Sequence, residues 1–156
     1  MKLLFCLIFI ICLGIIVFLC GRFFPRRWIF EDRFPYKSFS FEKRGNIYKA
    51  IKIQKWKKRW PDGSKIFHKF FGKFYPVKKM EEKDMKKIPI LIKESCVAES
   101  THFIVIILGV YCLKIWSGLG GVLVWIIWTL WNIPPILIQR YNRPRLKHAL
   151  QKCEKK

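Results

Sequence analysis

A glutamate and a histidine three residues apart, Glu99 and His102, are the internal residues of this chain best suited to proton-transfer chemistry. On a helix this spacing places both side chains on one face, and Ser95 shares that face. Histidine is the usual general base near neutral pH, and a neighbouring carboxylate orients the imidazole and raises its basicity. The alternative is a structural role at the wet end of a membrane span. As a metal site, the motif would supply only two ligands.

A second group of polar side chains follows the last apolar stretch of the chain. It is the heptapeptide Gln139-Arg140-Tyr141-Asn142-Arg143-Pro144-Arg145. Arginine binds phosphate or carboxylate in a two-pronged fork, so Arg140, Arg143 and Arg145 together predict a site for an anionic head group. A plain stop-transfer signal requires only positive charge and would not need the carboxamides or the phenol.

The composition indicates a small membrane protein of one domain, residues 1–156. The chain is 52% apolar yet has a net charge of +21, and the basic residues lie in two blocks between apolar stretches. Basic charge can also indicate nucleic-acid binding, but the chain has no helix-turn-helix, zinc-finger or RNA-binding motif. We therefore expect no nucleic acid as a partner, and attribute the charge to the positive-inside rule and to anionic lipid.

Residues 3–20 form the first predicted span, 18 residues without a charge. No A-x-A cleavage site follows it, so we interpret it as an uncleaved signal anchor. The positive-inside rule then places the N-terminus outside and the basic, aromatic-rich segment 22–88 at the cytoplasmic interface. Within this segment, residues 45–59 are expected to form a helix that ends at the turn signal 61–63.

Residues 89–138 are predicted to form a helical hairpin with a glycine-rich turn at 114–121. Residues 139–156 are predicted to form a basic cytoplasmic tail. The expected fold is thus all-α, with about three transmembrane helices; a re-entrant hairpin entering from the cytoplasm is the competing interpretation. Since the hairpin is antiparallel, the start of its first helix should lie beside the end of its second. The Glu99 motif and the arginine heptapeptide should therefore meet.

The six cysteines include no C-x-x-C pair, so neither a zinc ribbon nor a redox motif is expected, and no metal is predicted. Cys96 precedes His102 by six residues, which places the two side chains on different faces of a straight helix. It is interpreted as a packing residue rather than a nucleophile.

Several motifs, in order and spacing, resemble one bacterial family, the glycosyl-4,4′-diaponeurosporenoate acyltransferases of staphyloxanthin-type carotenoid pathways. The resemblance covers roughly residues 34–146. The residues that carry it are Glu42-Lys43-x-Gly45-x-Ile47-Tyr48, Ile53-x-Lys55-Trp56-Lys57, Pro61-Asp62-Gly63, Glu94-x-Cys96-x-Ala98-Glu99-x-x-His102, Asn132-x-Pro134 and Gln139-Arg140-Tyr141-Asn142-Arg143-Pro144-Arg145-Leu146. The chain departs from the family pattern at Val97, usually arginine, and at Phe103, usually tryptophan.

The resemblance implies a multi-pass enzyme of the bacterial cell membrane that esterifies a sugar hydroxyl of a glycosylated carotenoid, or a similar glycolipid, with a fatty acyl group. It implies no cofactor, with acyl-CoA or an acyl-carrier protein as the donor, and other carotenoid-pathway enzymes as partners. His102 would be the base and Glu99 would hold its imidazole. The donor phosphates would be bound by the three arginines of the heptapeptide. The remaining substrate-binding candidates are Gln139, Tyr141, Asn142, Asn132 and Asp62, of which Gln139 or Asn142 would donate to the oxyanion.

Two rival functions belong to other classes. One is a non-enzymatic membrane protein that binds anionic lipid and assembles pathway enzymes. The other is a small membrane methyltransferase, although the chain has no recognisable adenosyl-binding motif. The products that accumulate in membranes containing the chain distinguish all three.

Overall fold

The computed structural model describes residues 1–39, 42, 46–60 and 87–154, and its regular elements there are all helical. Three of them are long and apolar enough to cross a membrane. This agrees with the all-α, three-span fold expected from the sequence. The elements are α1 (Lys2–Phe23), the 3-10 helix η1 (Arg26–Trp28), α3 (Asn46–Ala50), α4 (Ile53–Trp56), α6 (Ile88–Gly109), α7 (Cys112–Ile115) and α8 (Leu119–Glu154).

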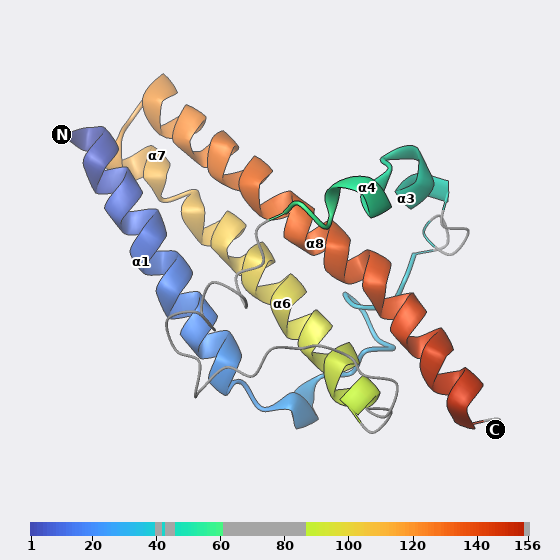
Figure 1. The fold of residues 1–156 in the computed structure, drawn as a ribbon. Helices are drawn as coiled ribbons and strands as arrows, with labels where there is room; N and C mark the ends of the chain where they lie inside the picture. Colours follow the sequence, from blue (N-terminus) through green and yellow to red (C-terminus); the bar gives the residue numbers. More distant parts are fainter. Residues whose placement is uncertain (40–41, 43–45, 61–86, 155–156) are drawn as a thin grey trace.

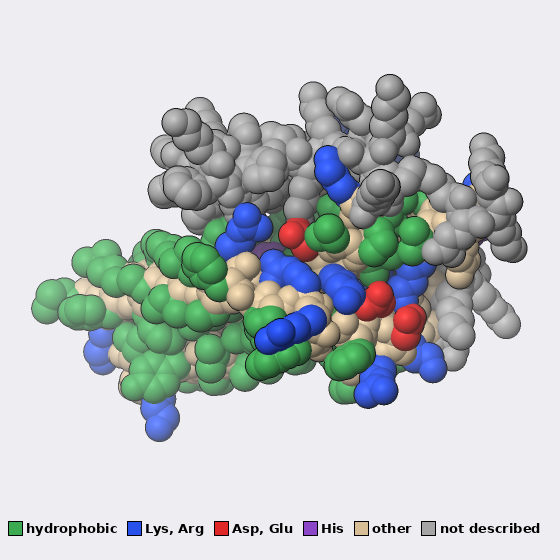
Figure 2. Space-filling view, turned by 90° about the horizontal axis from the view of Figure 1, so that it is seen from below, with side chains coloured by type: hydrophobic (Ala, Val, Ile, Leu, Met, Phe, Trp, Pro, Cys, Tyr) green, Lys and Arg blue, Asp and Glu red, His purple; other side chains and the backbone are tan. Residues whose placement is uncertain are grey.

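The three long helices lie side by side, with α6 between α1 and α8 (Figure 1). The short helices α3 and α4 lie against α8, and the two chain ends are at opposite ends of the molecule. In the view of Figure 2, hydrophobic side chains cover one end and charged side chains gather toward the other. This division matches the segregation of apolar and basic residues in the sequence.

Helix α1 packs on α6 through small residues. A Cβ at Gly21 would lie 2.4 Å from Cγ2 of Thr101 and 3.3 Å from Cγ1 of Val97, so only glycine permits this approach. At the other end of α1, Cys6 and Ile10 form a buried cluster with Cys112. The apolar run of α1 therefore ends beside Thr101 of α6.

Two tryptophans of α8 join the hairpin by bonding to backbone oxygens at the end of α6. The indole N–H of Trp125 donates to the Ile106 carbonyl and that of Trp128 to the Val105 carbonyl, both at 3.0 Å. The last carbonyls of a helix lack regular partners, so side-chain donors stabilise them. Gly109 allows this arrangement, since a Cβ there would lie 2.8 Å from Cδ1 of Trp128. The chain turns back at Gly118, whose φ is +88°.

Two expectations about helix boundaries differ from the structure. The helix expected over 45–59 is two short helices separated at Lys52, which has a left-handed φ of 49°; residues 43–45 are outside the described part. The tail expected at 139–156 is not a separate segment, because α8 continues to Glu154 through its internal prolines. At about 1.5 Å per residue, α8 is roughly 54 Å long and exceeds the ~30 Å hydrocarbon layer.

Helix α4 and the residues after it cover one side of α8. Ile53 is fully buried, and the rings of Trp60 and Trp131 lie 5.0 Å apart. Gln54 donates a hydrogen bond of 2.9 Å to the hydroxyl of Tyr141. The segment between the first two spans therefore rests on the last helix.

Gly109→Ala should destabilise the protein, because the new methyl group would displace the Trp128 indole from the Val105 carbonyl. We expect a loss of about 1–3 kcal/mol, the usual cost of overpacking. Thermal unfolding of the full chain in detergent measures it. Gly14→Ala is the matched control, since its Cβ would make an ordinary 3.8 Å contact with the same indole. Equal melting temperatures for the two variants would contradict this explanation of Gly109.

Candidate active site

A buried carboxylate, that of Glu99, lies between two arginines of α8. Its Oε1 accepts a 2.5 Å hydrogen bond from Arg140 and its Oε2 accepts one from Arg143. The side chains of Glu99 and Arg143 are only 9% and 3% exposed. Arg143 also donates to the hydroxyl and the carbonyl of Ser95, at 3.0 and 3.3 Å. The antiparallel hairpin thus places the Glu99 motif and the arginine heptapeptide side by side.

Arg140 connects this pair to the segment that follows α1. Its Nε donates to Oε1 of Glu42 at 2.7 Å and its Nη2 to Oε2 at 3.1 Å, a two-pronged ion pair. The guanidinium also lies over the Phe39 ring, 4.8 Å from its centre. Arg143 also contacts this segment, because its guanidinium donates a hydrogen bond of 2.8 Å to the carbonyl of Tyr36. Two arginines and two glutamates form one neutral cluster that links three parts of the chain.

Burial and the arginine act in opposite directions on the pKa of Glu42. Burial alone would raise it, but the hydrogen bonds from Arg140 and from the Phe39 amide lower it below 4.5. The ion pair therefore contributes stability that is complete above pH 4.5 and is lost as the pH falls through the lowered pKa. The same carboxylate, after burial, raises the pKa of Tyr48, whose hydroxyl donates to it at 3.1 Å.

The role expected for the arginines changes as a result. Sequence reasoning had Arg140, Arg143 and Arg145 all binding donor phosphate, but Arg140 and Arg143 are already neutralised by carboxylates inside the protein. Their spacing along α8 turns both toward α6, where Glu99 lies. Arg145 points elsewhere, and its guanidinium donates to the hydroxyl of Tyr141 at 2.8 Å.

His102 is held by Asn132 of α8. Its Nδ1 lies 2.8 Å from Oδ1 of Asn132, and Nδ2 of Asn132 donates to the Trp128 carbonyl at 2.8 Å. Because Nδ2 is the donor to Trp128, the atom facing the imidazole is an oxygen, which can only accept. Nδ1 therefore bears the proton in the neutral ring, and Nε2 carries the lone pair. This is the tautomer in which Nε2 can accept a proton.

The partner of His102 differs from the one expected. Glu99 was expected to hold the imidazole, but its two oxygens are engaged by arginines and Asn132 occupies that role. The motif spacing places residues on one face of a helix, yet it does not decide which of them a neighbouring helix will pair. Asn132 was already a substrate-binding candidate, because it belongs to a motif that carries the family resemblance. The structure instead places its side chain in contact with His102.

The other candidates lie in three places. Tyr141 and Asn142 face α4, where Asn142 accepts a 3.3 Å bond from Lys57. Gln139 follows Asn132 by seven residues and so lies on the same face of α8; no described residue bonds its carboxamide. Asp62 lies outside the described residues. Among the described residues, no three His, Cys, Asp or Glu side chains group closely enough to hold a metal.

Sequence reasoning missed three participants. Glu42 pairs with Arg140, the Tyr36 hydroxyl lies 2.7 Å from that of Ser100, and Thr129 has a buried hydroxyl without a hydrogen-bond partner among the described residues. Thr129 precedes Asn132 by three residues, so the two lie one turn apart on α8. Its only signal in the sequence is a polar residue inside an apolar span.

The structure also shows the surroundings of Val97 and Phe103, the two positions at which the chain departs from the family pattern. Val97 is 9% exposed and packs with Ile29 and Cys96. It also lies against Gly21 of α1. Phe103 is 58% exposed, on the apolar part of α6.

Comparison with known proteins decides the family. The profile of the family described as glycosyl-4,4′-diaponeurosporenoate acyltransferase matches residues 25–152. The chain belongs to this family and is an acyltransferase. It is 31% identical over 132 residues to the enzyme of that name from Staphylococcus aureus strain N315, covering 84% of this chain and 77% of the relative.

Further relatives carry the same name. The enzyme from S. aureus strain MRSA252 is 29% identical over 138 residues, with 84% of this chain and 77% of the relative covered. That from Staphylococcus haemolyticus is 31% identical over 117 residues, with 74% and 66% covered. No solved structure matches the chain.

Glu99→Gln should strongly destabilise this acyltransferase, because it removes the shared counter-charge of two arginines. We expect a loss of about 3–5 kcal/mol, measured by denaturant unfolding of the full chain. Asp32→Asn is the matched control: it removes the carboxylate of an ion pair with Lys147 in which Asp32 is 86% exposed. That change should cost about 1 kcal/mol or less. A small effect of Glu99→Gln would show that the cluster does not hold the helices together.

Proposed function

We propose that this acyltransferase esterifies a sugar hydroxyl of a membrane-embedded glycolipid, in particular a glycosylated carotenoid, with a fatty acyl group. The observation that carries the proposal is the His102–Asn132 pair, which presents a neutral imidazole with its basic Nε2 available. Among the described residues, no group bonds that nitrogen. The names of the relatives supply the class of acceptor.

His102 would accept the proton of the sugar hydroxyl as its oxygen attacks the carbonyl of an acyl thioester. The C–O ester bond forms, the C–S bond breaks, and the imidazolium returns the proton to the leaving thiolate. Asn132 would keep the ring oriented through both steps. General-base catalysis of this kind contributes about 10²–10⁴-fold to the rate.

The height of the pair in the molecule suits a lipid-borne acceptor. Gly21, where the apolar run of α1 ends, contacts Thr101, the residue before His102. On the far side of that level lie the buried ion pairs of Glu99. The base therefore lies at the boundary between the apolar and charged layers. A carotenoid tail in the bilayer would present its sugar at that depth, and a polar donor would approach from the other side.

Two polar groups of α8 have no partner among the described residues and suit the reacting groups. Gln139 lies on the face of Asn132, about two turns further along α8, and would donate its amide to the developing oxyanion. The buried Thr129 hydroxyl would bond a hydroxyl of the sugar, since an unsatisfied buried group costs about 1–3 kcal/mol. Asn142 suits the oxyanion less well, because Lys57 already bonds its oxygen.

Arg22 and the residues after it are proposed to face the cytoplasm, where acyl donors are made. This orientation follows from the positive-inside rule, and it puts the Glu99 cluster and the end of α8 on the donor side. The N-terminus would then be outside. The donor would be a thioester of coenzyme A or of an acyl-carrier protein.

Mass spectrometry of membrane lipids from cells with and without the chain tests the reaction. A glycolipid heavier by one fatty acyl unit supports acyl transfer, one methyl unit supports a methyltransferase, and no change supports a non-enzymatic membrane protein. His102→Ala should lower product formation by about 10²–10⁴-fold while the purified chain remains folded. Turnover near that of the wild type would rule out His102 as the base.

Asn132 provides a sharper test of the same base. Asn132→Leu should lower kcat by about 10–100-fold, a usual cost of losing such an orienting contact. Asn132→Asp keeps an acceptor for the Nδ1 proton and should therefore retain more activity than Asn132→Leu. Equal losses of kcat in the two variants would contradict the contact.

A further inference from the structure

We propose that the outer face of α8 around Arg145, together with Lys57 of the α4 segment, binds the phosphate of a phosphopantetheine-linked acyl donor. This inference rests on the proposed function. It moves donor binding away from Arg140 and Arg143, to the side of α8 that faces away from Glu99.

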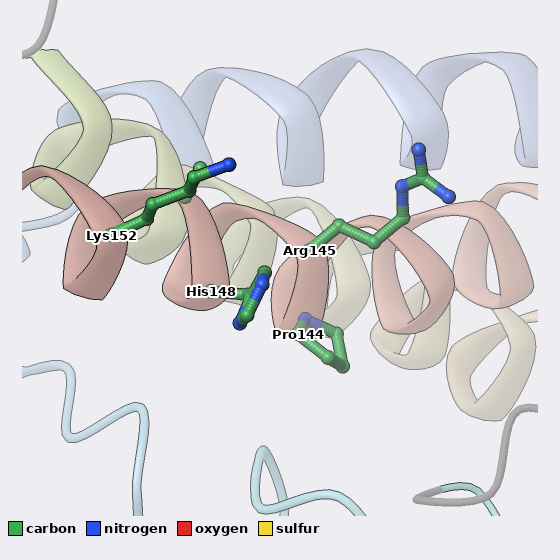
Figure 3. Close-up of a pocket in the computed structure, with 5 residues that line it drawn as sticks. Pro144, Arg145, His148 and Lys152 are labelled. Atoms are coloured by element: carbon green, nitrogen blue, oxygen red, sulfur yellow. The ribbon is translucent and has the colours of Figure 1, made fainter.

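A shallow hollow of about 500 Å³ borders this face on the C-terminal side of Arg145, and Lys57 and Tyr141 are not among its described lining residues. Figure 3 shows Pro144, Arg145, His148 and Lys152 rising from consecutive turns of α8. Ala149 completes the described lining. Arg145, His148 and Lys152 recur every three or four residues, so they form one basic stripe along the helix.

The cations of this face lack the partners that their neighbours have. Arg140 and Arg143 pair with buried glutamates, and Lys147 pairs with Asp32 at 2.5 Å. Within the described residues, no carboxylate lies within ion-pair distance of Lys57 or Arg145. Arg140 and Arg143 are therefore structural residues whose charge is balanced inside the protein. The charge that has no carboxylate partner among the described residues lies on the opposite side of α8.

Tyr141 holds the two unpaired cations together. The Nζ of Lys57 lies 4.6 Å from the centre of its ring and the guanidinium carbon of Arg145 lies 5.2 Å away. Burial lowers the pKa of Lys57, Tyr141 acts against that shift, and the charge of Arg145 adds to it. An anion bound between the two cations would relieve their repulsion.

The hydroxyl of Tyr141 can also donate a hydrogen bond to a bound anion. Its oxygen accepts hydrogen bonds from Gln54 at 2.9 Å and from Arg145 at 2.8 Å. The described residues provide no acceptor for its own proton. A phosphate oxygen would accept that proton and bond the guanidinium and the ammonium at once, which are the strong, charge-assisted contacts that phosphate forms.

The distance along α8 agrees with the donor. Arg145 follows Asn132 by thirteen residues, about 20 Å at 1.5 Å per residue. The pantetheine arm has about thirteen bonds between phosphorus and sulphur, and at the extension of a polypeptide backbone it spans roughly 16 Å. The thioester and the arginine side chain supply the remainder. Measured along the helix axis, the arm of a donor whose phosphate binds at Arg145 therefore reaches the level of Asn132, and it must also pass around α8 to meet His102.

The test measures binding of coenzyme A and of 4′-phosphopantetheine to the full chain in phosphatidylcholine nanodiscs, without reference to turnover. Arg145→Gln and Lys57→Gln should each weaken binding of both probes by about tenfold or more. Lys49→Gln is the matched control, since it removes one exposed charge of α3 that is not among the described lining residues of the hollow. It should change the affinity less than twofold, and His102→Ala should leave it unchanged.

Equal affinity in the wild type and Arg145→Gln would overturn the proposal, as would failure of both probes to bind the wild type. An equal loss in Lys49→Gln would reduce the effect to general attraction by net charge, and would also overturn it. If the variants lose affinity only for phosphatidylglycerol vesicles, the site binds lipid head groups instead of donor. If inorganic phosphate competes as well as coenzyme A, the site does not recognise the donor.

The two proposals fail separately. Probe binding that depends on Arg145, in a chain that yields no acylated lipid, would leave the phosphate site standing and reject the proposed reaction. If acyl transfer needs His102 but the KM for the donor is unchanged in Arg145→Gln, the proposed reaction stands and the phosphate site is rejected. Arg145 is exposed, so its replacement should not alter the melting temperature, and a normal melting temperature confirms that the variant is folded.

Discussion

The structure depends on one buried carboxylate shared between two arginines. Moving charged side chains out of water costs several kcal/mol for each ion, and that cost is recovered only where every charge has a partner. Glu99 and Glu42 balance Arg140 and Arg143, so the cluster is neutral as a whole. Because its members come from α6, α8 and the segment after α1, the cluster fixes how these parts align, which apolar contacts alone specify poorly in a membrane.

This constraint also determines what the other polar residues can do. Glu99 has no oxygen left for His102, so the imidazole takes its partner from α8, and an asparagine fixes its tautomer without adding a charge. Arg140 and Arg143 are committed to the interior, whereas Lys57 and Arg145, which have no carboxylate partner among the described residues, lie across α8 on the side of α4. One heptapeptide thus places its cations on two sides of α8, because successive residues of a helix point in different directions.

The boundary between layers follows from the same arrangement. The apolar run of α1 ends beside Thr101, and the tryptophans of α8 close the apolar half of the hairpin through the carbonyls of α6. The ion pairs begin immediately beyond. His102 and Asn132 therefore lie where the apolar part of the hairpin meets its buried charges.

The sequence by itself determined the three long helices, their antiparallel hairpin and the meeting of the Glu99 motif with the arginines, because hydropathy and helical spacing are local properties. It did not determine the pairing within that meeting. Glu99 and His102 share a face of α6, but the atoms that each of them bonds depend on the register of α8. The contact of Glu42 with Arg140 depends on how the segment after α1 lies against α8. The break at Lys52 and the continuation of α8 to Glu154 were equally hidden. Only the tertiary structure decided these, because each charge is satisfied by residues distant in sequence and the free energy of the buried cluster belongs to all its members together.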